Sequence, residues 1–138
     1  MIIKLNEEDN INEYLELDEK IFNNDSEIYN KIKYVYMLSF SQNEKPKISF
    51  GNLLEKDDFE IKYNCISRSV PGGASILDYY SNKVIGIHKS RDADNINLKW
   101  GTLLRYPLDE LNKKNWFHNF QKIRIHPILL DKKNKNIK

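Results

Sequence analysis

The chain lacks several features that mark whole classes of protein. It has 1 Cys in 138 residues, so no internal disulfide framework can form, and this usage predicts a reducing compartment, the cytoplasm. No apolar run approaches the roughly 20 residues that a membrane-spanning helix needs, and the acidic Glu7 and Glu8 come too early for a secretory signal. The formal net charge of +2 is too small to predict a nucleic-acid or membrane partner.

The sequence also lacks the residue patterns of a metal site and of a reactive thiol. His118 and His126 have no cysteine or carboxylate at the spacing that would complete a metal site. Nothing near Cys65 would activate a thiolate, so this residue is expected to be a small apolar group inside a strand. We therefore predict neither a metal nor a cofactor.

The residues that are abundant favour strands. Hydrophobic residues make up 40% of the chain, with 8 Tyr, 6 Phe and 2 Trp, which predicts a single all-β domain with a real core. A helical or turn-rich stretch is expected near 11–21, and a helix from Pro107, with Asp109 and Glu110 at its positive end. An apolar stripe of Leu108, Leu111, Trp116 and Phe120 would bury one face of this helix. Strands are predicted at 33–40, 47–54, 59–66, 75–80, 83–88 and 99–105.

The most specific pattern lies between Cys65 and Pro107. It includes V-P-G-G-A-S-I-L at 70–77, V-I-G-I-H at 84–88 and a later Gly-Thr pair at 101–102. This pattern resembles the C-terminal half of a trypsin-like serine peptidase, most closely the glutamyl-endopeptidase branch. There a G-x-S-G-x-P-I/V turn carries the nucleophile and precedes a hairpin that ends in V-I-G-I-H. The resemblance implies one six-stranded antiparallel barrel, the second half of a double barrel. This domain, with its N-terminal lead-in segment and a C-terminal helix, would span residues 1–126, and a polar tail would follow at 127–138.

The resemblance places a glycine where the nucleophile should be. Without gaps, Gly72 takes the nucleophile position, Gly73 keeps the motif glycine, and Ser75 replaces the motif proline. A glycine has no hydroxyl, so the chemistry cannot run in this alignment. In a rival alignment, with three residues deleted after Ser75, Ser75 itself is the nucleophile. That alignment removes the Gly and Pro whose backbone shapes the oxyanion pocket.

The other two members of the catalytic triad are also vacant. In trypsin-like peptidases the His and the Asp come from a first barrel that precedes the serine. The opening segment at 2–9 resembles the strand that follows the catalytic Asp, so this chain is expected to begin after that residue. Of its 3 His, only His88 lies near the motif, and it follows the serine position.

The resemblance gives His88 a role in binding. In glutamyl endopeptidases the His of G-I-H lines the primary specificity pocket, beside a hydroxyl residue five positions before the nucleophile, which here is Ser67. Ser67, His88 and Gly73 are thus the candidate substrate-binding residues, for a Glu or Asp side chain. The plain alternative is that His88 is a strand-end residue whose ring is satisfied within the fold.

The sequence thus predicts a catalytically inactive peptidase-like domain that binds a protein or peptide, or a second copy of itself. One alternative is a fragment or subunit of an active endopeptidase with Glu/Asp preference, to which His and Asp are supplied from elsewhere. The other is a structural remnant that binds no ligand. A lone second barrel would expose surface once buried against the first, and its edge strands could accept an extended peptide.

Overall fold

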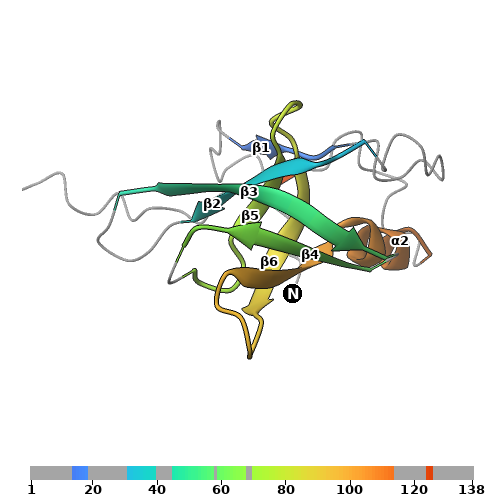
Figure 1. Ribbon diagram of the computed structural model, residues 1–138. Helices are drawn as coiled ribbons and strands as arrows, with labels where there is room; N and C mark the ends of the chain where they lie inside the picture. The colour runs from blue at the N-terminus through green and yellow to red at the C-terminus, as the bar shows by residue number, and fades with distance from the viewer. Residues whose placement is uncertain are drawn as a thin grey trace, which may run out of the picture.

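The computed structural model describes residues 14–18, 31–39, 45–57, 59–67, 70–113 and 124–125. Within these ranges the chain forms a closed barrel of six antiparallel strands, followed by a short helix at one end of the barrel (Figure 1). The predicted all-β barrel with a C-terminal helix is confirmed. Its elements are β2 (Tyr34–Ser39), β3 (Lys47–Lys56), β4 (Glu60–Cys65), β5 (Ser75–Asp78), β6 (Val84–Arg91), β7 (Leu98–Leu103) and α2 (Arg105–Lys113).

The barrel consists of two three-stranded meanders that close on each other. β2, β3 and β4 pair in sequence order, and so do β5, β6 and β7. The last strands of the two meanders, β4 and β7, then pair with each other, and so do the first strands, β2 and β5. The long connection from β4 to β5 is the link between the meanders, and it contains the Gly72–Gly73 turn.

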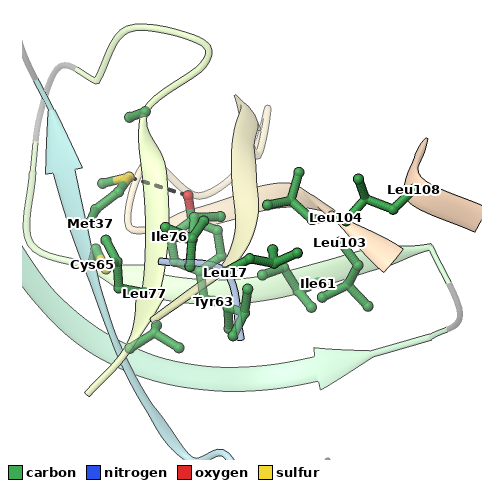
Figure 2. Packing of buried hydrophobic residues seen from close by; sticks show 14 residues of the cluster. Leu17, Met37, Ile61, Tyr63, Cys65, Ile76, Leu77, Leu103, Leu104 and Leu108 are labelled. Atoms are coloured by element: carbon green, nitrogen blue, oxygen red, sulfur yellow. Dashed lines mark hydrogen bonds between the residues drawn. The ribbon is translucent and has the colours of Figure 1, made fainter. Parts of the chain in front are cut away.

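The core follows the period-two pattern of the strands. On β4, Ile61, Tyr63 and Cys65 are buried while the residues between them are partly exposed. All four residues of β5 are buried, so this short strand departs from the alternation. Figure 2 shows the side chains of both meanders packed together inside the barrel, with Leu108 of α2 at its end. The interior is therefore filled with side chains.

Two sequence predictions about local structure are wrong. The stretch near 11–21 is not helical where it is described: β1 (Leu15–Glu16) pairs with β8 (Arg124–Ile125), and Leu17 forms a parallel bridge with Val84 of β6. Backbone pairing with distant strands overrides the local pattern. The helix begins at Arg105, so its first turn contains no acidic residue.

The acidic residues of α2 form side-chain ion pairs within the helix, whereas the sequence predicted them at its N-terminal, positive end. Asp109 forms an i,i+4 ion pair with Arg105 at 3.5 Å, and Glu110 pairs with Lys113 at 2.7 Å. Pro107 does lie in the first turn, where a missing N–H costs no helical hydrogen bond. Trp116, Phe120 and the tail at 127–138 lie outside the described residues, as does the opening segment at 2–9.

Across the described ranges, no helix has the length and apolar character to cross a membrane. The same ranges hold no group of three His, Cys, Asp or Glu residues that could bind a metal ion, while His118 and His126 lie outside them.

Candidate functional site

The glycine turn before β5 is tied to β6 by its backbone. The Ala74 amide donates to the Pro71 carbonyl at 3.3 Å, which closes a four-residue turn, and Gly73 has φ of 91°, a left-handed conformation that glycine adopts without strain. The Gly73 amide donates to the His88 carbonyl at 2.9 Å, and the His88 amide donates to the Ala74 carbonyl at 2.8 Å. The Gly73 amide is therefore engaged within the fold.

This turn borders an open cavity of about 260 Å³. Its wall brings together three residues that the sequence pattern singled out: Ser67, Gly72 and His88. Gly73 and Ser75 are not part of the wall. Ser75 is 9% exposed and lies in β5, where its backbone pairs with Leu38 and Ile87. The lining residues are Ser67, Val70, Gly72, His88, Lys89, Ser90, Arg91, Ile96 and Lys99.

His88 points its ring toward the barrel interior. The Nδ1 atom lies 2.7 Å from the hydroxyl of the fully buried Tyr63. The same hydroxyl lies 3.3 Å from the Met37 sulfur (Figure 2), and its single proton is donated to one of these two acceptors at a time. Burial lowers the pKa of His88, and the nearby charge of Lys99 lowers it further, against the opposing effect of a hydrogen bond to the Trp100 backbone. At neutral pH the ring is thus a neutral group that hydrogen-bonds Tyr63.

Lys99 is the buried charge of the site. It is 2% exposed, and its Nζ donates to the backbone carbonyls of Cys65 at 2.6 Å and Ile96 at 3.4 Å. Among the described side chains, no carboxylate forms an ion pair with it. Burial lowers the pKa of Lys99, because a charged ammonium loses water without gaining a counter-charge.

Lys99 is a residue of the site that no sequence pattern singled out. On β7 the buried residues are Lys99, Gly101 and Leu103, which alternate with partly exposed neighbours. A lysine in phase with the apolar face of a strand is unusual, because lysine is almost never fully buried without a partner. In the sequence, however, the apolar Leu98 and Trp100 flank Lys99, so the apolar pattern favours the other face of this strand and gives no signal for the burial of Lys99.

The described side chains around this cavity are cationic, hydroxyl and apolar groups. The ring of His88 contacts Tyr63 instead of a serine and a carboxylate, so the described residues contain no triad around it. Cys65 cannot supply a nucleophile, because burial raises the pKa of its thiol to about 11. Cationic and hydroxyl side chains dominate the wall, and none of the described Asp or Glu residues belongs to it. This chemistry favours an anionic ligand.

Comparison with known proteins adds no relative to this picture: no protein-family model matches the chain, and neither does any curated protein sequence. The likeness to the trypsin-like peptidases thus rests on the motif between Cys65 and Pro107.

Proposed function

We propose that this chain is a catalytically inactive serine-peptidase-like domain that binds a peptide segment, either free or exposed on a protein partner. The observation that carries the proposal is the cavity beside Gly72, whose wall contains Ser67 and His88, two of the three residues to which the resemblance gives a role in substrate binding. The location of the cavity also supports the proposal, because part of its wall belongs to the β4–β5 connection that links the two meanders.

The lack of a nucleophile supports the inactive reading. A Cβ atom added at Gly72 would meet nothing closer than the Lys89 carbonyl oxygen at 3.9 Å, so packing does not forbid a serine there. The glycine is thus a chemical difference rather than a steric requirement. Ser75, the rival nucleophile, is buried within a strand that is paired on both sides, which argues against its attack on a substrate.

The end of β6 offers a place for the backbone of a peptide. β6 pairs with β5 only as far as Ile87, and the turn at Gly73 and Ala74 engages the backbone of His88. Beyond that point Ser90 and Arg91 pair with β7 on one side, and the described residues provide no strand on the other. An extended peptide can add to such an edge and place one side chain in the adjoining cavity.

The charge of the cavity wall favours an acidic side chain in the bound peptide. Lys89, Arg91 and Lys99 lie in it, and a peptide with an acidic residue would bring the missing counter-charge. We place the domain in the cytoplasm, in keeping with the free and buried Cys65. The proposal includes no role for nucleic acid or membrane.

Two measurements test this function. First, the purified chain is treated with a fluorophosphonate probe and its intact mass is measured, with Ser75→Ala as the control. We expect no labelling, and labelling that disappears in Ser75→Ala would establish an activated serine and overturn the inactive reading. If the chain is instead a fragment of an active endopeptidase, labelling that depends on Ser75 should appear once a partner that supplies His and Asp is added.

Second, fluorescence polarisation is measured with labelled peptides that carry one Glu or one Gln at the same position. The proposal expects the Glu peptide to bind, the Gln peptide to bind more weakly, and neither to be cleaved after prolonged incubation. A chain that binds no peptide from an acidic library would be a structural remnant, and the proposed function would be wrong.

A further inference from the structure

The cavity contains more positive charge than one carboxylate would neutralise. Arg91 and Lys99 are direct partners in the antiparallel pairing of β6 with β7, so their side chains lie on the same face. Like charges in directly opposite positions destabilise a sheet. Within the described part of the chain neither residue has a carboxylate partner, whereas Lys89 is paired with Glu60. Among the described residues, Arg91 and Lys99 therefore lack a counter-charge.

The local backbone of β6 directs Arg91 to the cavity. The register of β6 shifts between His88 and Ser90, as at a β-bulge, and bulges commonly re-aim side chains at barrel rims. After the shift, Ser90 and Arg91 both lie in the cavity wall, with Lys99 buried behind them. The hydroxyl groups of Ser67 and Ser90 add hydrogen-bond donors.

The charge of this group of residues matches a dianion. His88 is neutral and adds no charge, because its burial disfavours the imidazolium. A phosphomonoester carries about −1.5 to −2 charges at pH 7 and has three strong acceptor oxygens, whereas a carboxylate carries one charge. A guanidinium can bind a phosphate through two parallel hydrogen bonds, and a buried ammonium adds a point charge beside it.

We propose that Arg91 and Lys99 bind the phosphate of a phosphorylated side chain in the bound peptide, with Ser67 and Ser90 as further donors. The proposal rests on the peptide binding proposed above and names the class of peptide. The phosphorylated residue enters the cavity of about 260 Å³, and apolar neighbours of that residue contact Val70 and the half-exposed Ile96 at the wall.

The test uses the full chain and three peptides of one sequence, in which the central residue is phosphoserine, Glu or Ser. Affinities are measured by isothermal titration calorimetry at fixed salt, with inorganic phosphate as a fourth ligand. We expect the phosphoserine peptide to bind at least about tenfold more tightly than the Glu peptide, and the Ser peptide and inorganic phosphate to bind more weakly still.

Variants assign the effect to the two cations. Arg91→Gln and Lys99→Met should each weaken phosphoserine binding by about tenfold or more and remove most of the advantage over Glu. The matched controls are Arg105→Gln on α2 and Lys47→Met on β3, which lie outside the cavity wall and should leave the affinity unchanged. Arg91 is exposed, so its substitution tests the proposal without disturbing the core.

Each remaining outcome has a distinct meaning. Equal binding of the Glu and phosphoserine peptides would overturn the phosphate site and leave peptide binding intact, whereas the absence of any peptide binding would overturn the proposed function itself. Inorganic phosphate that binds as tightly as the phosphopeptide would show an anion site with no peptide specificity, and would overturn the inference. In the unaltered chain, the ¹³Cε and ¹⁵Nζ signals of Lys99 should shift more with the phosphoserine peptide than with the Glu peptide, and a lack of shift with the phosphoserine peptide contradicts the proposal.

Discussion

The hydroxyl of Tyr63 should contribute measurably to the stability of the barrel. This side chain has no exposed surface, and its hydroxyl links His88 Nδ1 at 2.7 Å to the Met37 sulfur at 3.3 Å. Tyr63→Phe removes the hydroxyl and leaves the imidazole nitrogen buried without that partner. The cost of an unsatisfied buried polar group is about 1–3 kcal/mol. For a chain of this length, that loss corresponds to a decrease of roughly 4–12 °C in the midpoint of thermal unfolding.

The assay is thermal unfolding followed by circular dichroism at neutral pH. Tyr34→Phe is the matched control, because Tyr34 is 46% exposed and the same substitution there should change stability by no more than about 0.5 kcal/mol. A double-mutant cycle with His88→Leu isolates the interaction, since the cost of Tyr63→Phe should shrink when the imidazole is absent. If Tyr63→Phe unfolds at the temperature of the unaltered chain, the hydrogen-bonded arrangement of His88 described above is wrong.

Three further predictions concern pH, backbone packing and the N-terminal segment. Because burial lowers the pKa of His88, the unfolded chain takes up a proton near the ordinary value of 6.5 before the folded chain does. The free energy of unfolding should therefore decrease as the pH falls below about 6.5, and His88→Gln should reduce this slope in urea titrations. Gly51→Ala would place a Cβ 1.4 Å from the Asn64 carbonyl oxygen and should prevent folding, whereas Gly72→Ala meets no close atom and should unfold at an unchanged urea concentration. Leu17→Ala should cost about 2–5 kcal/mol in the same titration, because Leu17 is a buried member of the core, and a neutral result would mean that the segment around it does not pack on the barrel.

Much of the barrel could be predicted from the sequence because its strands alternate apolar and polar residues. β4 is the clearest example, with Ile61, Tyr63 and Cys65 buried in alternation. The last part of β6 could not be predicted, since Lys89, Ser90 and Arg91 are exposed and polar and form the strand only through their backbone pairing with β7. The strand at Leu15 was missed for the same reason.

The site was predictable in part. The motif led to Ser67, Gly72 and His88, and the structure places all three in the wall of one cavity. It did not lead to Lys99, because a lysine in a sequence is normally assigned to the surface. It also did not lead to Arg91, whose proximity to Lys99 depends on the register of two strands and on a bulge that no local pattern reveals.

The cavity is shared between the two meanders, and this arrangement couples ligand binding to their assembly. Ser67 follows the first meander, His88 and Lys99 belong to the second, and the ammonium of Lys99 is held by the carbonyl of Cys65 on β4. A ligand present at about 100 times its dissociation constant would thus stabilise the assembled barrel by about 2.7 kcal/mol. If the chain were cut within the β4–β5 connection, the two pieces would behave as a split receptor that reassembles in response to its ligand.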